Sequence, residues 1–231
     1  MMRPLAAVLV AAALFAAAAV AKTPVEDALD RQDRAQLEQL AQAAGKRAAQ
    51  AGNDAAAQYA HAVAQSALAQ AAMELADKNA ARAAAEAGIP AARKAVELKP
   101  QTAEYRRILG TLCGQVIPAN VLAGMKWGGC ARDEVNKALE LDGKAAMNWV
   151  SRGVGNYYLP PMFGGGVDKA IGDFRKAIQL DGKLAEAHLW LGLALRKQGN
   201  FAEARQALEK SLALNPARAW AKQQLDKTPK K

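Results

Sequence analysis

The sequence predicts an all-α protein in which antiparallel helix hairpins stack on one another. A short phrase that closes a helix recurs four times, at Lys94–Pro100, Lys137–Gly143, Lys176–Gly182 and Lys210–Pro216. The start positions 94, 137, 176 and 210 are 43, 39 and 34 residues apart, in the range of helix–turn–helix repeats. Alanine dominates the composition and aromatic residues make up only 5%, which favours helices over strands.

The first element along the chain is an expected signal peptide over residues 1–21. Arg3 precedes an apolar run from Leu5 to Val20, and Ala19-Val20-Ala21 gives the small-residue pattern for cleavage before Lys22. The alternative, an N-terminal membrane anchor, is disfavoured because the run is short and rich in alanine. We therefore expect an exported protein, periplasmic or secreted, with no stable membrane span after cleavage.

Residues 22–100 are expected to hold N-terminal helices with one degenerate repeat. An amphipathic pattern over Val25–Gln50 predicts one helix. Asn53-Asp54 can cap a long helix that runs to about Asp77. Its partner is expected over Ala80–Leu98, kinked at Gly88-Ile89-Pro90 because proline disturbs a helix interior.

Residues 101–216 form three units, of which the last is the clearest. Counted from Ala185, small residues fall at positions 8 and 20 (Gly192 and Ala204), and Pro216 falls at position 32. This pattern resembles the tetratricopeptide repeat (TPR) family, in which small side chains let two helices cross closely. The resemblance implies a right-handed α-solenoid and a scaffold that binds other proteins.

The two earlier units begin at Ala103 and Ala146, with Gly110 and Gly153 at position 8. Both carry inserts between their helices, at Pro118–Gly129 and Leu159–Gly166. Residues 217–231 are expected to form a capping helix, Ala217–Asp226, followed by a frayed tail. The apolar first insert and the PPxxGG pattern in the second also resemble a group of exported bacterial TPR proteins of unsettled function.

The only two cysteines, Cys113 and Cys130, fall on the two helices of one unit, at positions 11 and 19. Antiparallel packing brings these positions close together, and an exported protein folds where disulfides form. We expect a disulfide between them. The alternative is that the two cysteines are not bonded and pack as small buried hydrophobic residues.

We call the first helix of each unit helix A and the second helix B. In such repeats, positions 2, 5, 6, 9, 12 and 13 of helix A line the concave face, which is the expected partner-binding groove. Its candidate residues are Arg107, Ile108, Met147, Val150, Val154, Tyr157, Leu189, Trp190, Leu193, Arg196 and Lys197. Apolar and aromatic anchors with a cationic rim are typical of protein or peptide capture. The family's Lys/Asn clamp for a carboxylate is absent. The N-terminal helices, or a second copy of the chain, are alternative occupants of this face.

No catalytic residue, cofactor or metal site is predicted, and we expect a protein that is not an enzyme. His61 and His188 lie on different helices without a ligand pattern, and Gly164–Gly166 lacks the residues of a phosphate loop. The net charge of +9 is spread among acidic residues, so no nucleic-acid partner is expected. The predicted function is an adaptor for a protein or peptide. The alternative is a solute-binding or transporter-accessory protein that holds a small apolar ligand.

Overall fold

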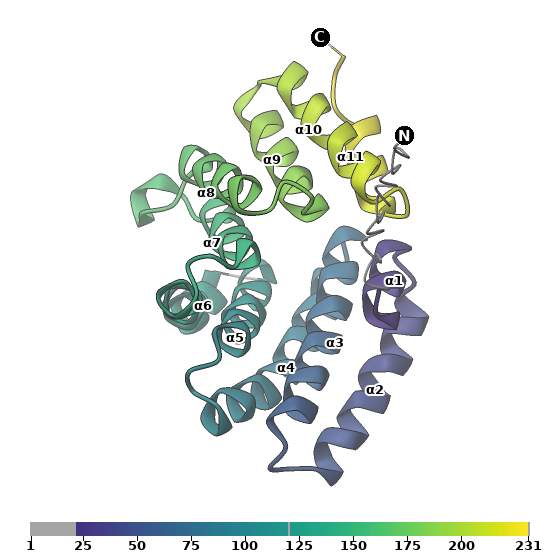
Figure 1. Cartoon of the computed structure of the whole chain (residues 1–231), viewed down its shortest axis with the longest axis vertical. Helices are drawn as coiled ribbons and strands as arrows, with labels where there is room; N and C mark the ends of the chain where they lie inside the picture. Colours follow the sequence, from purple (N-terminus) through teal and green to yellow (C-terminus); the bar gives the residue numbers. More distant parts are fainter. Residues whose placement is uncertain (1–21, 120, 231) are drawn as a thin grey trace, which may run out of the picture.

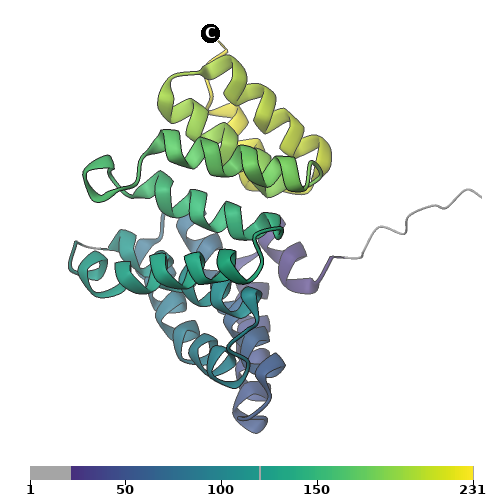
Figure 2. The ribbon, with the colours of Figure 1, turned by 60° about the vertical axis from the view of Figure 1, so that its left-hand side comes forward.

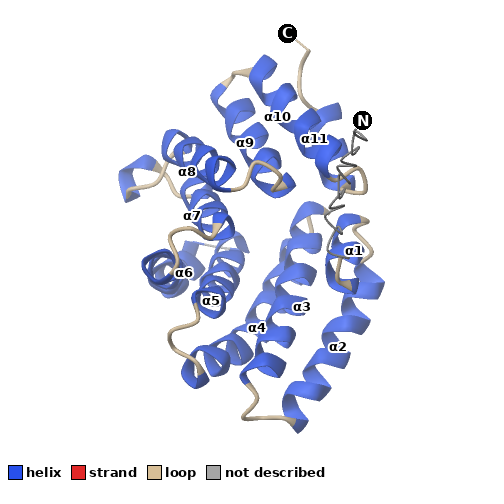
Figure 3. Ribbon diagram, in the orientation of Figure 1, coloured by secondary structure: helices blue, strands red, loops and turns tan. Residues whose placement is uncertain are grey.

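The structure is a computed structural model that describes residues 22–119 and 121–230. Within these residues the chain is all-α, which confirms the expected fold class (Figure 3). The α-helices of the described residues are α1 (Pro24–Asp30), α2 (Arg34–Gln50), α3 (Ala55–Glu74), α4 (Lys78–Leu98), α5 (Ala103–Val116), α6 (Val121–Leu141), α7 (Ala146–Tyr158), α8 (Val167–Leu180), α9 (Ala185–Gln198), α10 (Phe201–Leu214) and α11 (Ala219–Asp226). Two 3-10 helices, η1 (Ile117–Ala119) and η2 (Pro161–Phe163), lie in the inserts. The expected signal peptide lies outside the described residues.

Successive helices pair into hairpins that stack along the long axis of the molecule (Figures 1 and 2). The hairpins are α3–α4, α5–α6, α7–α8 and α9–α10, while α2 packs on α3 and α11 packs on α10. Helices α5, α7 and α9 begin at Ala103, Ala146 and Ala185, the residues at which the sequence pattern starts each unit.

Three glycines at position 8 allow the two helices of each unit to touch. A methyl group on Gly110 would lie 2.7 Å from Val135, one on Gly153 would lie 2.4 Å from Phe174, and one on Gly192 would lie 2.6 Å from Leu208. The partner is the position-24 side chain in every unit. Since real Cβ atoms do not approach other atoms so closely, each hairpin requires the glycine that the sequence supplies.

A second periodic contact joins each helix A to the linker before it. Arg106 Nε donates to the Pro100 carbonyl at 2.8 Å, and Trp149 Nε1 donates to the Gly143 carbonyl at 2.8 Å. His188 Nε2 lies 3.1 Å from the Gly182 carbonyl. All three side chains occupy position 4, so His188 takes the place of an aromatic residue because it satisfies the same linker carbonyl.

The N-terminal segment differs from the single helix expected over Val25–Gln50. Thr23 and Glu26 form a capping box that starts α1, and the chain then reverses at Gln32, whose φ is +55°. Asp33 caps α2 by accepting from the amide of Gln36 at 3.0 Å. Local capping therefore overrides the continuous amphipathic pattern.

The first insert does not lie wholly between its two helices, because α6 begins at Val121 and includes residues 121–129. The expectation of a frayed tail also needs correction. The tail is held as far as Thr228, whose side chain is buried and whose carbonyl accepts from Arg205 at 2.9 Å. Helix α4 runs through Pro90 as a single element.

Candidate interaction surfaces

The eleven predicted groove residues fall into three classes by exposure. Six are buried, namely Arg107, Ile108, Val150, Leu189, Trp190 and Leu193. Met147, Val154, Tyr157 and Arg196 are half-buried, and Lys197 is exposed. Most of the predicted groove therefore consists of side chains that are already packed within the protein.

Trp190 corrects the expectation most clearly, because it belongs to the core of the last two units. Its side chain is only 7% exposed and its ring centroid lies 6.2 Å from that of Phe174 and 5.4 Å from that of Trp220. Its Nε1 donates to Glu186 at 2.9 Å. Trp190 thus stabilises the repeat packing and does not present a free aromatic surface to a partner.

The predicted cationic rim is also engaged. Arg196 donates to the Gln224 carbonyl at 3.1 Å and to the Gln224 side chain at 2.7 Å, which fastens α9 to α11. Lys197 donates to the Tyr157 carbonyl at 2.8 Å and lies over the Tyr157 ring. These cations join neighbouring helices.

A polar network occupies the middle of the concave face. Tyr59 donates to Glu104 at 2.6 Å, and Arg107 Nε donates to the other oxygen of Glu104 at 2.7 Å. Burial raises the pKa of the Tyr59 phenol well above its ordinary value, and the carboxylate of Glu104 adds to the effect. Burial alone would raise the pKa of Glu104, but hydrogen bonds from Arg107 and Tyr59 hold it below its ordinary value. This part of the face is internally paired.

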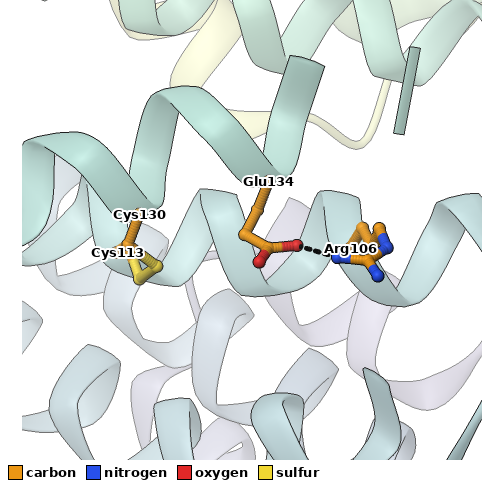
Figure 4. Close-up of a disulfide and its surroundings, with 4 residues drawn as sticks. All are labelled: Arg106, Cys113, Cys130 and Glu134. Atoms are coloured by element: carbon orange, nitrogen blue, oxygen red, sulfur yellow. Dashed lines mark hydrogen bonds and ion pairs between the residues drawn. A yellow bond between two sulfur atoms is a disulfide. The ribbon is translucent and has the colours of Figure 1, made fainter. Parts of the chain in front are cut away.

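The disulfide anchors the base of the first insert. Cys113 on α5 is bonded to Cys130 on α6, with an S–S distance of 2.04 Å. Figure 4 shows this bridge beside a second link between the same helices, in which Arg106 donates to Glu134 at 2.8 Å. The start of α6 extends beyond these two links.

Large apolar side chains project from both inserts. They are Leu122, Met125, Leu159, Met162 and Phe163, with exposures of 74%, 81%, 40%, 83% and 66%. We call this set the insert edge. Both inserts connect helix A to helix B in neighbouring units, so both lie on the left-hand edge of the molecule in Figure 2.

The sequence prediction did not include the insert edge among the binding residues, although a signal was present. Residues 108–131 carry one charge, on Lys126, and residues 153–167 carry none. The ring of Trp127, two residues after Met125 in the sequence, lies 4.9 Å from Lys126 Nζ and 5.6 Å from Arg93. Long uncharged stretches at the turns of a repeat fold indicate exposed apolar surface.

The two histidines considered in the sequence, and Ser151, have structural contacts. His61 packs against Gly45 and lies 3.3 Å from Gln65, and burial lowers its pKa. Ser151 receives hydrogen bonds from α5. In the part of the chain that the structure describes, no group of three or more His, Cys, Asp or Glu is placed to hold a metal ion. None of the described helices is long and apolar enough to cross a membrane.

Family comparisons agree with this geometry. A profile described as "Tetratricopeptide repeat" matches residues 185–218, the α9–α10 hairpin with its following turn. A second profile, described as "TPR repeat", matches residues 164–199. Residues 164–218 therefore contain tetratricopeptide repeats. Among curated proteins, none matches this chain significantly.

Solved structures share the TPR fold at low sequence identity. A thermophilic TPR protein from Thermus thermophilus superposes with a TM-score of 0.59 at 16% identity, over 87% of this chain and 97% of that one. The haemophore HusA from Porphyromonas gingivalis gives a TM-score of 0.54 at 19% identity, over 84% of this chain and 94% of that one. At these identities the similarity concerns the fold alone.

Proposed function

We propose that this TPR protein is an exported, non-enzymatic scaffold that binds a protein partner through the insert edge. The observation that carries the proposal is the set of five large apolar side chains exposed on two segments that the repeat does not need. Covering such side chains removes apolar surface from water, which favours association. Methionine and phenylalanine are also common anchors at protein interfaces.

A protein partner agrees with the general role of TPR repeats as interaction scaffolds. The concave face is a weaker candidate in this conformation, because its apolar residues pack against one another and its Arg and Glu side chains are paired. The same packing weighs against the alternative in which a small apolar ligand fills the groove.

Export is supported by the signal pattern of residues 1–21 and by the disulfide, since disulfides persist in oxidising compartments. The mature protein should begin at Lys22, which N-terminal sequencing of the periplasmic or secreted fraction would establish. Membrane-bound protein that retains Met1 would overturn the export proposal.

The partner can be sought by placing a photo-crosslinking residue at Met125 or Met162 in producing cells. Both positions should yield the same cross-linked protein, because they lie on one edge. The same residue at Glu97, whose side chain is 69% exposed on α4, is the control and should not yield it. Products that appear equally at all three positions would contradict a specific interface.

Binding to the purified partner then tests the surface quantitatively. Met162→Ser combined with Phe163→Ser should weaken binding about tenfold or more, the loss expected for removing interface anchors. Leu75→Ser is the matched control, because Leu75 is an exposed leucine outside the inserts. Equal affinity of both variants for the partner would rule out the insert edge as the interface.

A further inference from the structure

The first and last parts of the superhelix meet at a buried arginine. Arg218, directly before α11, has a side chain that is 2% exposed. Its guanidinium donates to both carboxylate oxygens of Glu74 at the end of α3, at 2.9 Å to one of them. It also lies 3.8 Å from Asp30 of α1 and 3.6 Å from Glu186 of α9. Figure 1 shows the ends of α1 and α3 facing α9 and α11.

Further polar contacts surround this cluster. Lys22 Nζ donates to Asp30 at 2.5 Å and to Asn215 at 2.7 Å, across 193 residues of sequence. Gln32 donates to Glu74 at 3.0 Å and accepts from Gln223 at 2.8 Å. The left-handed conformation of Gln32, which is uncommon for glutamine, brings its side chain to this junction.

Among the described residues, the apolar clusters on the two sides of the junction are separate. The buried cluster of the last two units contains residues from Ala146 to Leu225, whereas the clusters of the N-terminal half contain residues from Val25 to Ala131. Among the described residues, ion pairs and hydrogen bonds join the two ends. We name residues 22–141 the first body and residues 146–230 the second body.

The chain connection between the bodies is also polar. A turn over residues 142–145, exposed at its first three residues, joins α6 to α7, and Asp142 accepts from the amides of Lys144 and Ala145. Beside it, Asn148 donates to the Ala138 carbonyl at 3.2 Å, and Ser151 lies 3.4 Å from both Arg107 and Thr111. Exposed turns of this kind absorb hinge motion in domain closure.

We propose that the superhelix is a clamp, hinged at residues 142–145 and held shut by a latch made of Arg218, Asp30, Glu74 and Glu186. An apolar seam would close the ends firmly, whereas taking these charges out of water offsets much of their mutual attraction. Burial raises the pKa of Glu74 even though Arg218 pairs with it. The two bodies keep their own cores when the latch opens.

The latch depends on Arg218 because it faces three carboxylates. Removing the guanidinium leaves Asp30, Glu74 and Glu186 without the cation that they share. Gln70 donates to Glu74 and to Glu186 but is neutral, and Lys22 contacts only Asp30 among the three. Arg218→Met should therefore open the clamp while both bodies remain helical.

A distance measurement between the bodies tests this. Spin labels are attached to cysteines introduced at Gln39 on α2 and Lys222 on α11, both exposed, in oxidised protein whose native cysteines are bridged. Arg218→Met should shift the distance distribution to longer values and broaden it, with an unchanged helical circular dichroism signal. Arg175→Gln is the control, because it removes one cation from an exposed pair with Glu203 and should leave the distribution as it is.

A second variant tests whether opening in Arg218→Met comes from repulsion between the three carboxylates or only from the loss of the packing contacts of Arg218. Replacing Asp30, Glu74 and Glu186 by Asn, Gln and Gln in the Arg218→Met background removes the repulsion and should return the distribution toward its original position. An unchanged distribution in Arg218→Met would overturn the proposal, as would loss of helical signal together with opening. The proposal is independent of the insert edge, so partner binding and clamp opening can fail separately.

Discussion

At the residue scale, the closest helix crossings in this protein depend on single glycines. Gly153 and Gly155 lie on the same helix, yet only Gly153 faces a neighbour. Gly153→Ala should destabilise the protein by about 1–3 kcal/mol, because the added methyl group overlaps Phe174. Gly155→Ala should stabilise it by about 0.5–1 kcal/mol, since alanine loses less backbone entropy in a helix. Urea unfolding of the two variants measures the contrast, and equal effects would refute the crossing argument.

Glu104 should make the stability of the protein fall as the pH is lowered. Its pKa is held below its ordinary value, so its contribution to stability is present above the unfolded pKa and is lost as pH falls through the folded pKa. Glu104→Gln should lower the thermal midpoint at pH 7, and the difference from the original protein should shrink on acidification below about pH 4.5. Glu97→Gln, in an exposed pair with Lys94, should change the midpoint little at any pH. A difference for Glu104→Gln that grows in acid would contradict this assignment.

Residue identities could be predicted where a local rule fixes them. The position-8 glycines and the proximity of Cys113 to Cys130 follow from repeat spacing, because spacing determines which side chains face each other within a hairpin. The burial of Trp190 could not be predicted in this way, because a side chain at its position of helix A can face either the groove or the next helix. That choice depends on superhelix curvature, which no spacing in the sequence specifies.

At the element scale, the disulfide holds the extension of α6 against α5. Its closed segment spans 17 residues, so reduction should lower the free energy of unfolding by about 3 kcal/mol in the chain-entropy model. Chemical unfolding with and without reductant measures this difference.

The same experiment has a local readout in limited trypsin digestion. Reduction should accelerate cleavage at Lys126, which lies in the extension, and should leave cleavage at Lys46 and Arg47 in α2 unchanged. Uniform acceleration at all three sites would mean that the bridge supports the whole fold instead of the insert.

Element boundaries were predictable where caps and glycines punctuate the pattern. The starts of α5, α7 and α9 fall on the expected alanines. The break between α1 and α2 could not be predicted, because the amphipathic pattern continues through it and the left-handed residue is a glutamine. The helical conformation of most of the first insert could not be predicted, because its glycines and Pro118 are poor helix formers.

At the scale of the whole molecule, the stack of hairpins could be predicted but its closure could not. Each hairpin follows from neighbouring residues, whereas the latch joins side chains 32 to 188 residues apart in sequence. No periodic pattern marks Asp30, Glu74 or Arg218 as partners.

An ordinary stack of repeats has two free ends, and its terminal helices open more readily than its central ones. The contact between α1 and α11 through the latch gives each end a neighbour, so this chain should lack a preferred site for fraying. Amide hydrogen exchange should therefore protect α1 and α11 nearly as well as α5 in the native protein. In Arg218→Met both terminal helices should exchange first. Rapid exchange at both ends of the unsubstituted protein would show that the latch is already open in solution.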